Sequence, residues 1–360
     1  MVFFISKKTL LAWLVLLAWI STACILSDGT PGTSSPTDQA EEMGWYTVYF
    51  TQPDDPQAGS YRGGPDEALA KAIEVAHLSV DVAAHQLNLW SIRDALLSAA
   101  RRGVNVRLVV ESDFMDEPEI VQLKEAGIPI LGDRRESLMH NKFVVIDRSE
   151  VWTGSLNFTT SDVYRNDNNL VRIRSTRLAE NYTKEFNEMF EQDLFGDKTL
   201  AQTPYPSFTV NSTQLEVYFS PDDGTAAQIV RHIRSARESI HFLAFSFTSD
   251  EIARAMLDMT LQGVTVTGVF ESSQVKSNIG GEFGLFQEAG LDVRLDGNPR
   301  NMHHKVIIID EQKVITGSYN FSSNAETRND ENTLVIHDST IAGLFMAEFE
   351  RIFAQAQISN

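Results

Sequence analysis

The second half of the chain alternates apolar runs with segments of helical period. Apolar-rich runs predict buried strands at residues 215–220, 240–247 and 264–271. Apolar spacings of three and four residues predict helices at residues 225–239 and 249–263. Ser249 and Gly263 are typical start and stop residues for the second helix. Strands that alternate with helices predict an α/β fold whose sheet is covered on both faces.

The first half of the chain repeats this pattern, and local stretches of sequence match. MHNKFVVID at residues 139–147 matches MHHKVIIID at 302–310, and VWTGSLNF at 151–158 matches VITGSYNF at 314–321. RNDNNLV at 165–171 matches RNDENTLV at 328–335, so the offset stays close to 163 residues. Each half also ends on an amphipathic segment, at residues 176–195 and 338–357. These matches predict a duplicated domain.

A polar stretch with two prolines separates the two copies and is interpreted as the connector. The predicted organisation is a first domain over 45–200 with its motif at 134–161, a linker over 201–213, and a second domain over 214–360 with its motif at 297–324.

The first 23 residues have the layout of a secretory signal, with lysines before an apolar run of eleven residues. That run is too short to span a bilayer, which needs about 20 residues. Ala23 directly precedes Cys24, the only cysteine, and this pair resembles a bacterial lipoprotein lipobox, although Ser21 replaces the usual leucine. Residues 24–44 have the composition of a disordered tether. We expect an exported protein that is anchored to a membrane by lipid on Cys24. The alternatives are an ordinary signal peptide with a chance cysteine, or an uncleaved anchor.

The net charge of −19 makes the surface acidic. Such a surface repels polyanions at long range, which argues against a non-specific nucleic-acid binder. It does not exclude a local basic pocket.

Each copy carries a histidine and a lysine two residues apart, His140 with Lys142 and His303 with Lys305. Side chains alternate along a strand, so each pair shares a face and His304 points the other way. Asn141 takes the place of His304 in the first copy, which favours a flanking role for this position.

The full spacing, His-x-Lys-x4-Asp-x6-Gly-Ser-x-Asn, occurs twice and resembles the signature of the phospholipase D superfamily. The resemblance covers both halves, roughly residues 45–355. It implies two α/β/α sandwich domains related by a pseudo-twofold axis, with the two motifs meeting in one active site. It also implies a reaction without metal or other cofactor. One histidine forms a phosphohistidine, while the other protonates the leaving group and then activates water.

The chemistry of a phosphodiester fits these residue types. Imidazoles titrate near neutrality and serve as nucleophile and general acid, and two lysines supply charge where negative charge builds up. Neutral hydrogen-bond donors are expected from the asparagines and serines of the motif, namely Asn157, Asn320, Ser155 and Ser318.

An acidic residue near the end of the motif orients a catalytic histidine of the opposite half in duplicated family members. By that resemblance Glu331 would hold His140 as the nucleophile, and His303 would be the general acid. Asn168 replaces the acid in the first copy, with nearby Asp167 as a stand-in.

Two further pairs of acids recur in both copies. Asp147 and Asp310 lie off the His/Lys face and are expected to bind backbone at the strand end. Glu111 and Glu271 end equivalent strands, where either a supporting role at the site or a turn-capping role fits.

The remaining histidines carry no motif. His85 at a strand end could touch substrate, but an ordinary partly buried histidine is favoured. Ordinary roles are also expected for His77, His232, His241 and His337.

These features favour a monomeric phosphodiesterase of the phospholipase D type that acts on phospholipids. An endonuclease of the same superfamily, a phosphatidyl transferase and a catalytically silent binding module are the alternatives. Two intact motifs speak against the binding module.

Overall fold

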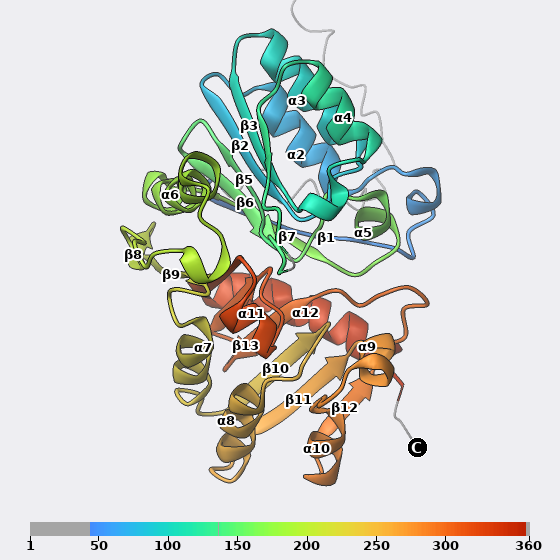
Figure 1. Ribbon diagram of the computed structural model, residues 1–360. Coiled ribbons are helices and arrows are strands. Elements are labelled where there is room, and N and C mark those ends of the chain that lie inside the picture. The colour runs from blue at the N-terminus through green and yellow to red at the C-terminus, as the bar shows by residue number, and fades with distance from the viewer. Residues whose placement is uncertain (1–43, 136, 358–360) are drawn as a thin grey trace, which may run out of the picture. The chain divides into compact units, whose positions relative to one another are not determined.

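The computed structural model describes residues 44–135 and 137–357. The predicted leader, Cys24 and almost all of the predicted tether lie outside the described residues. Figure 1 shows the two halves, blue to green in the first and yellow to red in the second, each built on its own sheet.

The first half contains a mixed sheet with strand order β1-β7-β6-β5-β2-β3-β4. Strands β2, β3 and β4 are parallel, and β5 runs antiparallel between β2 and β6. Its elements are β1 Tyr46–Phe50, α2 Pro65–Glu74, β2 Ser79–Ala84, α3 Trp90–Arg101, β3 Asn105–Val110, α4 Pro118–Glu125, β4 Ile130–Gly132, β5 Lys142–Ile146, β6 Glu150–Gly154, α5 Thr160–Tyr164, β7 Asn169–Arg174 and α6 Thr176–Gln192.

The second half repeats this topology with one additional edge strand, in the order β12-β11-β10-β13-β14-β15-β9-β8. Its elements are β8 Ser207–Val210, β9 Thr213–Ser220, α7 Thr225–Ile233, β10 Ser239–Ala244, α8 Asp250–Thr260, β11 Thr265–Phe270, α9 Ser272–Ser277, α10 Phe283–Glu288, β12 Asp292–Leu295, β13 Lys305–Ile309, β14 Lys313–Gly317, α11 Ser323–Thr327, β15 Glu331–His337 and α12 Ser339–Gln355. The predicted duplicated α/β fold is therefore confirmed.

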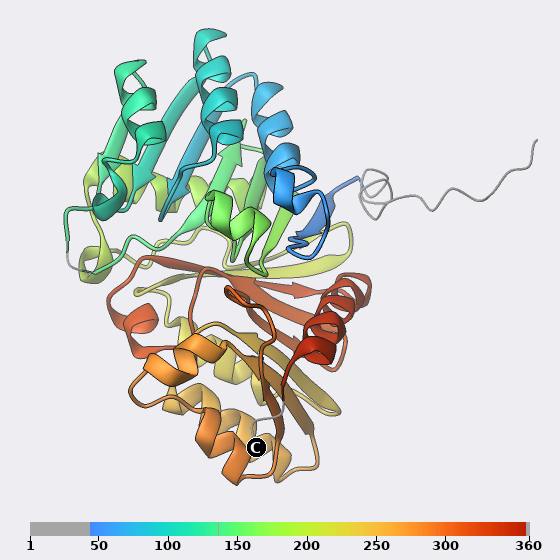
Figure 2. The same cartoon turned by 90° about the vertical axis from the view of Figure 1, so that its right-hand side faces the viewer.

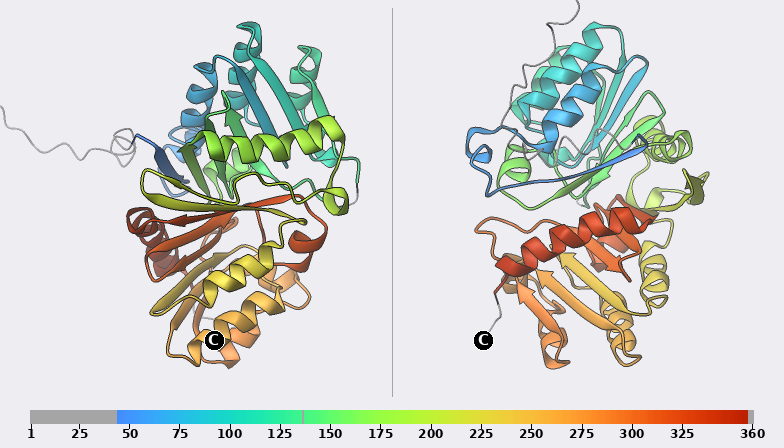
Figure 3. Two further views of the ribbon diagram at one scale, coloured as in Figure 1. Left: turned by 90° about the vertical axis from the view of Figure 1, so that its left-hand side faces the viewer. Right: turned by 180° about the vertical axis from the view of Figure 1, so that it is seen from behind.

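Both faces of each sheet are buried, which explains the continuous apolar strands. One outer core lies between the first sheet and α2, α3 and α4, and another lies between the second sheet and α7, α8 and α10. The inner faces of both sheets share a central core with α6 and α12. Figure 3 shows these two helices along the boundary between the halves, α6 in its left view and α12 in its right view.

Two predicted boundaries are wrong. The predicted linker 201–213 contains β8, which pairs with β9 through a turn at Asn211 and Ser212, both with positive φ. Two nearby prolines are typical of a connector, so the sequence did not predict this short strand. Helix α7 ends at Ile233 rather than at Ser239, since Arg237 to Ser239 give their backbone N–H groups to a carboxylate described below.

Candidate active site

The two motifs meet at the boundary between the halves through short stretches of paired backbone. Met139 pairs in parallel with Asp330, and His140 N donates to Asp330 O at 3.0 Å. Met302 pairs in the same way with Asp167, and His303 N donates to the Asp167 carbonyl at 2.8 Å. Each motif histidine is therefore anchored to the opposite half, and Figure 2 shows how closely the two halves approach along this boundary.

The residue before each histidine is held by a glutamate from its own half. Met139 N donates to Glu111 Oε2 at 2.7 Å, and Met302 N donates to Glu271 Oε2 at 2.6 Å. The second carboxylate oxygen of each glutamate caps the next turn, accepting Asp113 N or Ser273 N. The supporting and capping roles left open by the sequence are therefore both present.

A direct carboxylate contact orients His140. Its Nδ1 lies 2.7 Å and 2.8 Å from the two oxygens of Glu331, which comes from the second half. The contact expected between these residues is therefore present. Burial, with Lys142 and Lys305 nearby, holds the pKa of His140 well below its ordinary value. A neutral imidazole whose Nδ1 proton is donated to Glu331 leaves the Nε2 lone pair free to attack.

The partner of His303 is different. Its Nδ1 lies 2.9 Å from Asn168 Oδ1 and 3.3 Å from Asp162 Oδ1, both from the first half. The suggested stand-in, Asp167, is wrong, because its carboxylate oxygens accept from Arg351 and Asn298. Asp162 was missed because the repeat has no acid at the equivalent position in the second half.

The two lysines lie close to both motif histidines, because, after burial, the charges of Lys142 and Lys305 lower the pKa of each histidine. Each Nζ donates to the carbonyl oxygen of the histidine two residues before it, at 2.7 Å for both Lys142 and Lys305. Both side chains are buried, and burial lowers the pKa of Lys142 to about 8 and the pKa of Lys305 well below its ordinary value. The opposite-facing His304 bonds instead to Asn169 and Glu348.

The motif serines contact the partners of the histidines, and their substrate-binding role stays a prediction. Ser318 Oγ donates to Glu331 Oε2 at 2.6 Å, and Ser155 Oγ donates to Asn168 Oδ1 at 2.9 Å. In this arrangement each hydroxyl proton is directed at the partner of a histidine. The preceding Gly317 has a φ of 151°, and a Cβ there would meet Asn332 O at 2.1 Å, which explains the glycine.

The motif asparagines retain unused amide atoms at the site. Asn157 donates through Nδ2 to Asp162 Oδ2 at 3.2 Å. Asn157 Oδ1 and Asn320 Oδ1 have no hydrogen-bond partner within residues 44–135 and 137–357. Their assignment as catalytic donors stays a prediction.

His85 lies at the site rather than in ordinary packing. Its ring centroid is 4.8 Å from that of His140, and its buried Nδ1 has no hydrogen-bond partner in the described chain. Phe245 takes the equivalent place in the second half, 4.5 Å from the ring of His303. The equivalence follows from the backbone, since His85 N and Phe245 N donate to the residue after each motif histidine.

Asp147 and Asp310 bind backbone away from the reacting groups. Asp147 accepts from the N–H groups of residues 77, 78 and 79, and Asp310 accepts from those of residues 237, 238 and 239. The backbone contact expected from strand alternation is present in both copies.

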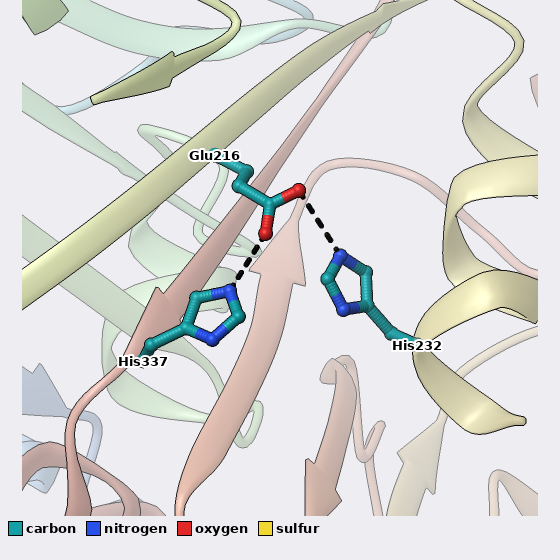
Figure 4. A group of neighbouring side chains, drawn as sticks. All are labelled: Glu216, His232 and His337. Carbon is teal, nitrogen blue, oxygen red and sulfur yellow. Dashed lines mark hydrogen bonds and ion pairs between the residues drawn. The ribbon is translucent and has the colours of Figure 1, made fainter. Parts of the chain in front are cut away.

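A second group of titratable residues lies in the second half (Figure 4). Glu216 carboxylate oxygens lie 2.7 Å from His337 Nε2 and 3.3 Å from His232 Nε2. Tyr218 and Arg231 also donate to this carboxylate, and Arg231 contacts His232 Nε2 at 2.9 Å. The arginine thus stands where a metal ion would have to bind, and hydrogen bonds account for the group.

The fold and the paired motifs define the class of protein. A family model described as "Cardiolipin synthase, PLD-like domain" matches residues 69–190 and again residues 229–353. Because the two matches cover more than half of the chain, the chain belongs to this family, within the phospholipase D superfamily.

Individual relatives agree with this assignment. The chain is 34% identical over 160 residues to a phospholipase D of Rickettsia bellii (strain RML369-C), covering 43% of this chain and 79% of the relative. It is 36% identical over 133 residues to the mitochondrial cardiolipin hydrolase of Homo sapiens, covering 37% of this chain and about half, 52%, of that relative. The crystal structure of a phosphatidylserine synthase from Haemophilus influenzae Rd KW20 shares the fold, with a TM-score of 0.63, 13% identity and 87% of each chain covered.

Proposed function

We propose that this protein hydrolyses phosphodiesters without a metal ion, through a phosphohistidine on His140. The observation that supports this best is the arrangement of the two histidines. Each has its Nδ1 occupied by a partner from the opposite half, and two buried lysines lie close to both.

In the first step, His140 Nε2 attacks phosphorus while His303 gives its Nε2 proton to the leaving oxygen. Lys142 and Lys305 place positive charge beside the non-bridging oxygens as negative charge builds up there. In the second step, the now neutral His303 takes a proton from water. The resulting hydroxide attacks phosphorus and breaks its bond to His140, which restores both histidines.

We propose a phospholipid as the substrate. The net charge of −19 disfavours a polyanion, and relatives named phospholipase D and cardiolipin hydrolase are in line with a lipid. Nucleic-acid hydrolysis and phosphatidyl transfer are the competing activities, and the latter would need an alcohol in place of water.

The test assays the purified full chain, before and after addition of EDTA, on three substrates in parallel: phosphatidylcholine vesicles, single-stranded DNA and bis(p-nitrophenyl) phosphate. Hydrolysis of the vesicles and of the aryl diester is expected. Loss of both activities on adding EDTA would contradict the metal-free mechanism. Cleavage of DNA but not of lipid would assign the substrate to nucleic acid instead.

We further propose that the protein is an exported, monomeric lipoprotein anchored through Cys24. The signal-like leader before this lone cysteine supports the anchor, and the presence of both motifs in one chain supports the monomer. Within the described ranges, no helix has the length and apolarity to cross a bilayer. Cys24→Ala should move the protein from the membrane to the soluble fraction, and light scattering should give the mass of one chain. A variant that stays in the membrane fraction would contradict the lipid anchor.

A further inference from the structure

The two halves of the site carry an acidic residue at different positions of the repeat. The offset of 163 residues makes Asn168 equivalent to Glu331, and Asp162 equivalent to Ala325. The half with an amide at the first position therefore has an acid at the second, and the half with an acid at the first has alanine at the second.

Folding brings the relocated acid back to the histidine. The Asn168 side chain links Asp162 to His303, because its Oδ1 is 2.9 Å from His303 Nδ1 and its Nδ2 donates to Asp162 Oδ1 at 3.1 Å. The same Asp162 oxygen is 3.3 Å from His303 Nδ1. All three side chains are buried, so solvent screens their interaction weakly.

We propose that Asp162 is the carboxylate that positions His303, acting through the Asn168 amide, and that it replaces the acid missing from position 168. This inference rests on the proposed function. It adds a positioning residue for the second histidine, and it explains how a site with only one acid of the Glu331 type can serve two histidines.

A purely structural role for Asp162 is tested by the repeat itself. Asp162 lies in the first turn of α5, where Thr159 accepts from its backbone N–H at 3.1 Å and donates to its carboxylate at 2.7 Å. The equivalent helix α11 forms with Ala325 at this place, capped by Ser322 alone. Capping therefore does not require the carboxylate. Capping alone also does not explain why the Asp162 carboxylate lies so close to His303.

The arrangement makes the two histidines unequal. A direct carboxylate contact increases the electron density of His140 and favours attack on phosphorus. The relayed contact stabilises an imidazolium at His303 less, which leaves this residue the stronger acid. The other charged or titratable groups that face His303 are Lys305, Lys142, His140 and His85. Burial first, and then these groups, lower the pKa of His303, and a carboxylate at Asp162 acts against them.

The first experiment exchanges the residues between halves and measures kcat on bis(p-nitrophenyl) phosphate. Asp162→Asn should lower kcat by about 10–100-fold, the size of one hydrogen bond to a charged group. The double variant Asp162→Ala/Asn168→Glu copies the second half and should recover most of this loss. Asn168→Glu alone places two carboxylates side by side and should be slower than the double variant.

The second experiment needs no turnover. Nuclear magnetic resonance of ¹⁵N-histidine-labelled protein should show a lower pKa for His303 in Asp162→Asn than in the wild type. The double variant should show a higher pKa than Asp162→Asn, while His140 stays unchanged in both variants. Because Asp162→Asn is nearly isosteric, its melting temperature serves as the control for folding.

The outcomes separate this inference from the proposed function. If the wild type hydrolyses no phosphodiester, the proposed function fails, and the resonance experiment still tests the position of the carboxylate. If the wild type is active but Asp162→Asn keeps its kcat and the pKa of His303, the inference is overturned. A folded double variant that is as slow as Asp162→Asn would overturn it as well.

Discussion

His140 and His303 occupy equivalent places, yet the groups that hold them differ. Glu331 touches His140 directly at 2.7 Å, whereas the nearest partner of His303 is the Asn168 amide at 2.9 Å, with the Asp162 carboxylate farther away at 3.3 Å. The contacts that hold the backbone are the same in both halves, including the glutamate that fixes the residue before each histidine. The duplication has therefore kept its scaffold symmetric while its proton chemistry has become asymmetric, as expected where one group attacks and the other donates a proton.

The largest effect should come from removing either histidine. His140→Asn and His303→Asn should each lower kcat by about 10⁴-fold or more, since nucleophile and acid act as one unit. Mass spectrometry of samples quenched in alkali, where the P–N bond of a phosphohistidine is stable, sharpens the comparison. His303→Asn should accumulate a phosphohistidine at His140 with an activated aryl diester, which needs little help from an acid. A phosphohistidine trapped in His140→Asn would reverse the assigned roles.

Much of this asymmetry could not be predicted from the sequence. The repeated spacing predicts the fold and the two His/Lys pairs, and the resemblance to the phospholipase D superfamily adds the contact of Glu331 with His140. Asp162 has no acidic counterpart in the repeat, and it reaches His303 only because α5 folds back toward the second half. His85 is separated from His140 by 55 positions and meets it only across paired strands. The serines match the motif, but only the folded site shows which groups accept hydrogen bonds from their hydroxyls.

The next largest effect concerns pH, because burial moves the pKa values of Glu331 and Lys142 toward neutrality. Burial raises the pKa of Glu331 to about 7 and lowers the pKa of Lys142 to about 8. Glu331 loses its charge below the first value, and Lys142 loses its charge above the second. These two groups by themselves make kcat/KM rise through about pH 7 and fall above about pH 8, and loss of the His303 proton adds a further fall at the pH where that residue titrates.

Glu331→Gln is the matched test of the acidic limb. It should lower kcat/KM by about 100-fold and remove the rise near pH 7, because glutamine does not titrate. Lys142→Arg should shift the fall to higher pH, since arginine keeps its proton. An unchanged profile in Glu331→Gln would show that another group controls the acidic limb.

A smaller effect on activity is expected when the residue that packs on His140 is changed to the residue that packs on His303. His85→Phe copies the second half, where Phe245 packs on His303. The ring should fit, so the melting temperature should stay the same. The substitution removes the Nδ1 atom of His85. If this atom contacts substrate, kcat/KM should fall about 10-fold, which corresponds to the loss of one hydrogen bond to a charged group. A variant with wild-type kcat/KM would restrict His85 to packing.

The smallest effect should appear where the halves are the same. Asp147 and Asp310 have φ of 52°, a backbone conformation that asparagine tolerates, so Asp147→Asn and Asp310→Asn remove charge without adding strain. Burial raises the pKa of each carboxyl, but three backbone N–H donors outweigh burial and lower it below its ordinary value. Each charge therefore stabilises the fold above the ordinary pKa, and this contribution is lost as the pH falls through the lowered one. Partial exposure limits this contribution to about 1 kcal/mol at pH 7.

Urea unfolding should show an equal loss of unfolding free energy for the two variants at pH 7. In acid, the difference between each variant and the wild type should shrink. Their kcat should match the wild type. A loss confined to one variant would mean that the scaffold has diverged along with the chemistry.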